Sequence, residues 1–182
     1  LITSKTKALL LSYPNNPTGG VITAEVGREL AELVKKHDLL LISDEVYSHL
    51  TYEGEHVCLA ALPGMKERTI LLNGFSKAYA MTGWRLGYAV APTEIIKAMT
   101  KIHQYTMLCA PINAQKAAVE ALRSASGDRE RMVTEYNRRR LLFVKGLNEI
   151  GLDCFEPRGA FYAFPSIART GLDSLTFSEE LL

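Results

Sequence analysis

Short apolar runs alternate with an amphipathic segment in the first part of the chain, which is the pattern of an α/β fold. Residues 8–13 form an apolar run stopped by Pro14, and they predict a strand buried on both faces. Apolar residues then recur at helical spacing and predict a helix over about 23–37. A second apolar run begins at Leu39. A strand, a helix and a strand this close together are joined by a right-handed crossover, so we expect the two strands to be parallel.

Later segments extend this organisation. Two more apolar runs, residues 69–73 and 86–90, continue the predicted sheet. Helical periodicity follows around residues 95–102 and 114–122, and then over a stretch of about 128–150 that is long enough to link two domains. We therefore expect a partial large domain over residues 1–127, with a mostly parallel sheet and flanking helices. A connecting helix should follow over residues 128–150.

The pattern changes after Gly151. Residues 152–155 and 160–164 are short segments separated by Pro157-Arg158-Gly159, and we predict them as two strands in the start of a small α+β domain over residues 151–182. The chain begins with Leu1 rather than Met, and its last residues have a helical pattern without a terminator. We therefore expect an excised piece of a longer protein, in which this second, smaller unit is truncated.

Composition and charge exclude several classes of protein. Hydrophobic residues make up 47% and charged residues 23% of the 182, which is the balance of a soluble globular protein. With 21 Lys and Arg against 20 Asp and Glu, no overall field attracts nucleic acid or an acidic membrane. The longest purely apolar stretch is residues 39–42, too short to cross a bilayer. The basic run Arg138-Arg139-Arg140 lies in a predicted helix, where successive side chains diverge, so we expect it to be solvated or to bridge domains.

The cysteines and histidines bear on the cellular compartment and on metal binding. The three cysteines are far apart and form no C-x-x-C pair, which favours a reducing, cytoplasmic location. The four histidines have neither the spacing nor the cysteine partners of a metal site, so we expect no metal.

Polar side chains collect where the predicted strands end. In a parallel α/β sheet, ligands bind beyond the carboxyl ends of the strands. Six polar side chains follow the predicted strands: Asn16 after the first strand, Asp44 and Tyr47 after the second, and Ser76, Lys77 and Arg85 after the third. Taken singly, Asp44 suits a helix cap or a salt bridge, and Lys77 suits a solvated surface.

Together these residues suggest a more specific chemistry. A partly desolvated lysine is suited to form a Schiff base with an aldehyde. If the aldehyde belongs to a pyridine ring, a carboxylate such as Asp44 can keep the ring nitrogen protonated. The guanidinium of Arg85 and the hydroxyl of Ser76 can hold a phosphate. Asn16 and Tyr47 can donate hydrogen bonds to a ring oxygen.

Three motifs carry a resemblance to a known family. Residues 13–19 (Tyr-Pro-Asn-Asn-Pro-Thr-Gly), 43–47 (Ser-Asp-Glu-Val-Tyr) and 74–88 (Gly-Phe-Ser-Lys through Trp-Arg-Leu-Gly-Tyr) match in order and spacing. In these motifs the chain resembles the fold-type I, class I/II aminotransferases that use pyridoxal 5′-phosphate (PLP). Weaker similarity continues through Ala110-Pro111 and residues 159–165, so the resemblance covers nearly the whole chain.

The resemblance implies a role for each candidate residue. Lys77 would form the internal aldimine and later move a proton between the substrate α-carbon and the cofactor, and Asp44 would pair with the pyridinium nitrogen. Asn16 and Tyr47 would bind the phenolic oxygen. The phosphate would be held by Ser76 and Arg85. The implied reaction is transfer of an amino group from an L-amino acid to a 2-oxo acid, and relatives of this kind are homodimers.

Two departures from the family pattern stand out. Many relatives have Ser or Thr three positions before the lysine, where this chain has Gly74. Three features of the family cannot be placed in residues 1–182: a Gly-rich phosphate loop, an aromatic residue that stacks on the ring, and an arginine that binds the substrate carboxylate. The resemblance therefore implies a piece that lacks the amino-terminal third and the end of the small domain. Such a piece alone should be a poor catalyst. Two alternatives remain open: a non-catalytic PLP-binding domain of a regulator, and a PLP-dependent lyase.

Overall fold

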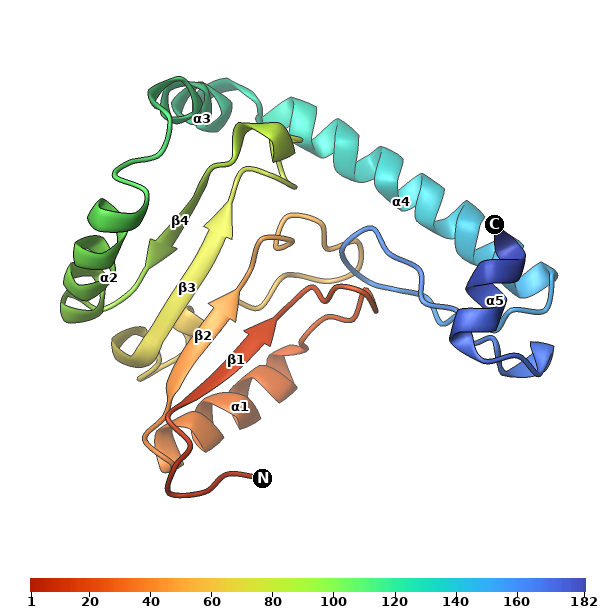
Figure 1. Cartoon of the computed structure of the whole chain (residues 1–182), viewed down its shortest axis with the longest axis horizontal. Coiled ribbons are helices and arrows are strands. Elements are labelled where there is room, and N and C mark those ends of the chain that lie inside the picture. The colour runs from red at the N-terminus through yellow and green to blue at the C-terminus, as the bar shows by residue number, and fades with distance from the viewer.

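The computed structural model describes residues 1–182, and an α/β core with a helical second half accounts for most of them (Figure 1). The strands are β1 (Ala8–Ser12), β2 (Leu40–Asp44), β3 (Thr69–Gly74) and β4 (Gly87–Val90). The helices are α1 (Ala24–Lys36), α2 (Thr93–Thr106), α3 (Ile112–Ser124), α4 (Ser126–Glu149) and α5 (Ser174–Leu181). Short 3-10 turns occur at η1 (Leu59–Ala61), η2 (Lys66–Arg68), η3 (Thr82–Trp84) and η4 (Ala168–Thr170).

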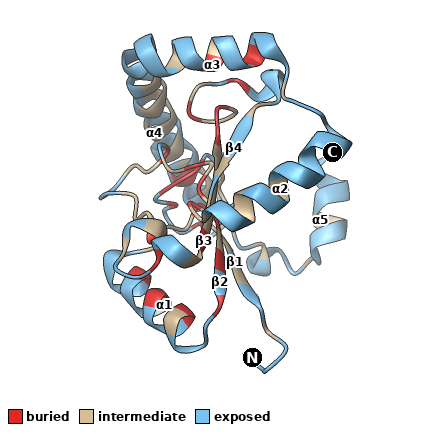
Figure 2. Ribbon diagram, turned by 90° about the vertical axis from the view of Figure 1, so that its left-hand side faces the viewer, coloured by how far each residue is buried: buried red, intermediate tan, exposed pale blue.

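The four strands form one sheet in the order β1-β2-β3-β4. β1, β2 and β3 are parallel, and β4 is antiparallel to β3. Seen along the sheet edge, α1 lies on one face and α2 on the other (Figure 2). The prediction of a mostly parallel sheet with flanking helices is therefore confirmed.

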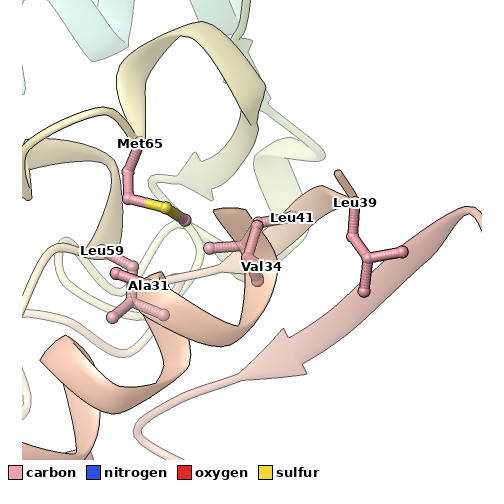
Figure 3. Close-up of a cluster of buried hydrophobic side chains, with 6 residues drawn as sticks. All are labelled: Ala31, Val34, Leu39, Leu41, Leu59 and Met65. Atoms are coloured by element: carbon pink, nitrogen blue, oxygen red, sulfur yellow. The ribbon is translucent and has the colours of Figure 1, made fainter. Parts of the chain in front are cut away.

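Helix α1 is defined by its cap and its charges as well as by its apolar face. The Thr23 hydroxyl accepts a hydrogen bond from the backbone N–H of Val26, and Lys35 and Lys36 lie in the last turn. The inner face of the helix packs against β2 and the 3-10 turns that follow it. This cluster is the main hydrophobic core, made of Ala31, Val34, Leu39, Leu41, Leu59 and Met65 (Figure 3).

Two smaller clusters support the other end of the sheet. Phe75 and Met81 pack against Ala118 of α3, which holds the turn after β3 in place. Tyr47 and Leu50 pack against Ala160, with Tyr136 of α4 at the edge of the cluster. The segment that follows α4 is therefore in contact with the segment that follows β2.

Helix α4 connects the two halves of the molecule, and it begins two residues before the predicted start at 128. The division into residues 1–127, 128–150 and 151–182 stays a prediction. Within the basic run, Arg138 and Arg139 pair with Glu135 on the helix surface. Arg140 is nearly buried and bridges Glu53 and Glu156.

Two sequence predictions are wrong in detail. Residues 152–155 and 160–164 are not strands, and the segment makes only an isolated bridge between Gly159 and Thr51. The side chain of Asn148 instead binds the backbone N–H and carbonyl of Cys154, and Ala160 has a φ of 56° that no strand residue adopts. β1 is also not buried on both faces, because it is the edge strand of this sheet and 67% of Leu10 is exposed.

No helix combines the length and the apolar character needed to cross a membrane. The structure contains no group of three or more His, Cys, Asp or Glu side chains arranged to hold a metal ion.

Candidate active site

The register of the sheet brings the predicted site residues to one edge. Ser12 of β1 is paired with Asp44 of β2, and Asp44 is paired with Leu72 of β3. β1 and β2 therefore end at the same level and β3 continues to Gly74, and the carboxyl ends of all three strands point toward α4 (Figure 1). β4 runs the other way and pairs Gly87 with Gly74, so the chain before β4, including Arg85, returns to this edge.

Two neighbouring carboxylates at the end of β2 have different environments. Glu45 is buried, where it accepts a hydrogen bond from the Ser43 hydroxyl (3.0 Å) and lies 2.6 Å from Nε2 of His56. Asp44 is half-buried, and its Oδ1 accepts the backbone N–H of Val46 at 3.2 Å. Asp44 forms no ion pair, so its carboxylate is available to a ligand, whereas Glu45 is already engaged by Ser43 and His56.

Lys77 lies among aromatic rings. Its Nζ is 5.6 Å from the ring centre of Tyr47 and 5.5 Å from the ring centre of Phe161, both within cation–π range. The amine has no anionic partner in the structure. Lys77 is half-buried in the turn after β3, and the rings of Tyr47 and Phe161 lie close to its amine.

Tyr47 is the most enclosed of the predicted site residues. Its side chain is buried, and its hydroxyl is hydrogen-bonded to the hydroxyl of Tyr162. Burial, followed by the hydrogen bond and proximity of Tyr162 and by the negative charge of Asp44, raises the pKa of Tyr47 well above its ordinary value of 10. The phenol therefore keeps its proton and can donate it in a hydrogen bond.

The turn from Ser76 to Arg85 is held by its own polar groups. The Thr82 hydroxyl donates to the carbonyl of Ser76 at 3.1 Å, and Nη1 of Arg85 donates to the carbonyl of Thr82 at 3.1 Å. Arg85 has a φ of 52°, a left-handed conformation unusual for a side chain of this size. The structure thus brings Ser76 and Arg85 into one turn and leaves the guanidinium exposed.

Close packing of the backbone explains why position 74, where many members of the resembled family have Ser or Thr, is a glycine. A Cβ at this position would lie 3.0 Å from the carbonyl oxygen of Leu86 and 3.1 Å from the Cα of Gly87. β3 and β4 approach closely here, so a side chain in place of Gly74 would need the facing strand to move.

Asn16 lies in the loop after β1. Its neighbour Asn15 organises this loop, accepting a hydrogen bond from the Thr18 hydroxyl at 2.7 Å and donating to the carbonyl of Ser12. Asn16 is exposed, and its side chain makes no hydrogen bond within the protein. The amide is therefore free for a ligand at the same edge of the sheet.

Sequence reasoning did not include Phe161 and Tyr162 among the site residues. Both belong to the weakly similar segment 159–165, and that similarity was the available signal. The structure brings them beside Tyr47 and Lys77 because the segment is fixed at several points. Ala160 donates to the carbonyl of Leu50 (2.8 Å) and Gly159 donates to the carbonyl of Gly19 (2.9 Å).

A cavity of about 230 Å³ lies behind these two aromatic residues, between α4 and the segment 157–163. Its lining is mainly apolar, and its arginines, Arg139 and Arg140, are already paired with glutamates. The unpaired polar groups lie instead at the edge of the sheet, so we take that edge as the candidate site.

Comparison with known proteins gives the family. The profile of the family described as aminotransferase class I and II matches residues 1–182. A putative aminotransferase, YugH, of Bacillus subtilis (strain 168) is 58% identical over 181 residues, covering 100% of this chain and 47% of that protein. An aspartate aminotransferase of Pyrococcus abyssi (strain GE5 / Orsay) is 50% identical over 184 residues, with the same coverage.

Solved structures agree with the sequence relatives. The crystal structure of an aromatic aminotransferase from Pyrococcus horikoshii OT3 superposes with a TM-score of 0.97 at 49% identity, covering 100% of this chain and 49% of that one. The α/β fold is therefore that of an aminotransferase. The chain belongs to the class I and II aminotransferase family, and it spans about half the length of the relatives that it matches.

Proposed function

We propose that the protein is a PLP-dependent aminotransferase that moves an amino group between an L-amino acid and a 2-oxo acid, with Lys77 as its catalytic lysine. The observation that carries the proposal is the meeting of Lys77, Tyr47 and Asp44 at one edge of the sheet, in a chain of this family. The relatives are named for different substrates, among them aspartate and aromatic amino acids, so the proposal does not extend to one substrate.

The residues present fit the cofactor. Lys77 supplies an amine without an anionic partner, and Asp44 supplies a carboxylate that is bound only by a backbone N–H. Arg85 supplies an exposed guanidinium in the same turn as Ser76, and Thr82 is hydrogen-bonded to both residues. An aldehyde, a pyridinium nitrogen and a phosphate would each find a complementary group in this set.

Each residue would have a defined task. When bound, the pyridine ring of PLP supplies an electron sink for charge that develops at the substrate carbon. Lys77 Nζ would attach to the cofactor aldehyde with loss of water, and after the substrate amine displaces it, the freed amine would take up and return a proton at the reacting carbon. Asp44 would hold the proton on the ring nitrogen. Tyr47 and Asn16 would donate hydrogen bonds to the ring oxygen, and Ser76 and Arg85 would bind the phosphate.

We also propose a cytoplasmic enzyme that acts as a homodimer. The three cysteines, Cys58, Cys109 and Cys154, are all free thiols in the structure, which supports a reducing compartment. The dimer rests on the family resemblance.

The test is a half-reaction assay on the full-length gene product. The protein is loaded with PLP and mixed with single amino acids, with and without a 2-oxo acid acceptor. An aminotransferase gives one equivalent of 2-oxo acid per site without acceptor and turns over only when acceptor is added. Continuous product formation without acceptor would identify a lyase. PLP binding without any product from a broad panel of amino acids would favour the regulator.

A further inference from the structure

We propose that Tyr162 is a positioning residue for Tyr47, and that its hydroxyl donates a hydrogen bond to the Tyr47 oxygen so that the Tyr47 proton faces the bound cofactor. This inference rests on the proposed function. It adds a residue from the far end of the chain to the site built by β1, β2 and β3.

The contact between the two phenols is specific. Their hydroxyls are hydrogen-bonded across a separation of 115 residues, and their rings meet edge to face with centroids 5.7 Å apart. Tyr47 is the sole hydrogen-bond partner of the Tyr162 hydroxyl in the structure. Because Lys77 Nζ lies over the ring of Tyr47, the hydroxyl pair is next to the group that would carry the chemistry.

The position of Tyr162 is fixed by backbone contacts rather than by its own side chain. The Tyr52 hydroxyl donates to the carbonyl of Ala160, and the backbone N–H of Tyr52 donates to the carbonyl of Arg158 at 2.9 Å. Nη1 of Arg140 donates to the carbonyl of Pro157 at 2.8 Å. These contacts hold the backbone just before Tyr162 and do not involve its hydroxyl, so we expect removal of that hydroxyl to leave this backbone in place.

The proton count gives the direction of the hydrogen bond. Each phenol has one proton, and the bond between the two hydroxyls uses one of them. If Tyr47 gave its proton to Tyr162, its oxygen would have no donor left for a ring oxygen. With Tyr162 as the donor, the Tyr47 proton is free, and its O–H is polarised by the hydrogen bond that it accepts.

The surroundings of the pair keep the proton on Tyr47, which this arrangement requires. Asp44 approaches from the end of β2, Lys77 from the turn after β3 and Tyr162 from the segment after α4. Tyr47 is buried beside a carboxylate, conditions that keep it as a neutral phenol. A neutral Tyr47 donates to an anionic ring oxygen, and that oxygen then holds the neighbouring proton on the Lys77-linked nitrogen less tightly.

The test is a pH titration of the absorption spectrum of PLP bound to the full-length gene product. In Tyr162→Phe, Tyr47 becomes a weaker hydrogen-bond donor, so the midpoint of the spectral change should rise by about 0.5 pH unit. A shift of this size corresponds to a fraction of the free energy of one hydrogen bond. Tyr136→Phe is the matched control, since Tyr136 packs on Phe161 at 5.3 Å but its hydroxyl makes no hydrogen bond. Its midpoint should equal that of the unchanged protein.

A double variant shows whether Tyr162 acts through Tyr47. In a Tyr47→Phe background, the further change Tyr162→Phe should leave the midpoint where it is. An unchanged midpoint in the single variant Tyr162→Phe, or equal shifts in both backgrounds, would overturn the proposal. Failure of PLP to attach to Lys77 in the unchanged protein is a separate result, and it would count against the proposed function itself.

Should Tyr162→Phe fail to fold, the unchanged protein still provides a test. With carbon-13 at the tyrosine Cζ atoms, PLP binding should move the NMR signals of both Tyr47 and Tyr162. A Tyr162 signal that stays fixed while the Tyr47 signal moves would overturn the proposal.

Discussion

Gly159 lies directly against Pro14, so closely that an added Cβ would come within 2.5 Å of the proline Cβ and 2.7 Å of its Cγ. Pro14 belongs to the loop after β1, and Gly159 belongs to the segment that delivers Phe161 and Tyr162 to the site. The absence of a side chain at position 159 therefore allows the two halves of the candidate site to meet.

Replacement of this glycine should separate the two halves. Gly159→Ala should lower the free energy of unfolding by about 1–3 kcal/mol, because a rigid proline ring has to move. Gly146→Ala in α4 is the control: a Cβ there meets nothing within 4 Å, and it should raise stability by about 0.5–1 kcal/mol. Urea denaturation of the full-length gene product measures both. Equal stability of Gly159→Ala and the unchanged protein would contradict the packing described here.

Arg85 should contribute to cofactor affinity through the geometry of its guanidinium. Arg85→Lys keeps the positive charge but loses the paired N–H donors, so we expect PLP to bind about tenfold more weakly. Arg123→Lys on the exposed face of α3 should leave the affinity unchanged. Equilibrium dialysis of PLP gives both values. An Arg85→Lys variant that binds PLP as tightly as the unchanged protein would remove Arg85 from the phosphate site.

Ala80, in the turn after Lys77, has a φ of 52° and an exposed side chain. Ala80→Gly should stabilise the protein by about 0.5–1 kcal/mol, since the left-handed cost to alanine exceeds the flexibility that glycine adds to the unfolded chain. The same substitution at Ala98, exposed within α2, should destabilise by about 1 kcal/mol. Thermal unfolding compares the two. A loss of stability in both variants would show that the turn tolerates alanine without strain.

Glu135 should titrate far below an ordinary carboxyl group. Hydrogen bonds from Arg138 and then Arg139 lower the pKa of Glu135 from 4.5 to about 2. The pairing therefore stabilises the folded protein above pH 4.5, and this contribution is lost as the pH falls toward 2. Carbon-13 NMR of the carboxyl group measures the pKa directly. In Arg138→Gln it should rise toward 4.5, and a value near 4.5 in the unchanged protein would contradict the ion pair.

Local sequence patterns predicted the part of the site that depends on strand ends. Asp44 follows an apolar run and Lys77 follows another, and parallel strands that end together bring such residues to one edge. The contact of Tyr162 with Tyr47 could not be predicted in this way, because it depends on hydrogen bonds between segments more than 100 residues apart. The prediction of a strand over 160–164 was wrong for the same reason. The backbone N–H of Ala160 donates to the carbonyl of Leu50, which lies in a loop, rather than to a neighbouring strand.

The identity of the nucleophilic amine is the central claim, and covalent labelling tests it most directly. The full-length gene product is loaded with PLP, reduced with borohydride, digested and analysed by mass spectrometry, with Lys77→Arg treated in parallel. We predict one pyridoxyl label per chain, on Lys77, and none in the variant. A label on another lysine, or equal labelling of the variant, would contradict the account.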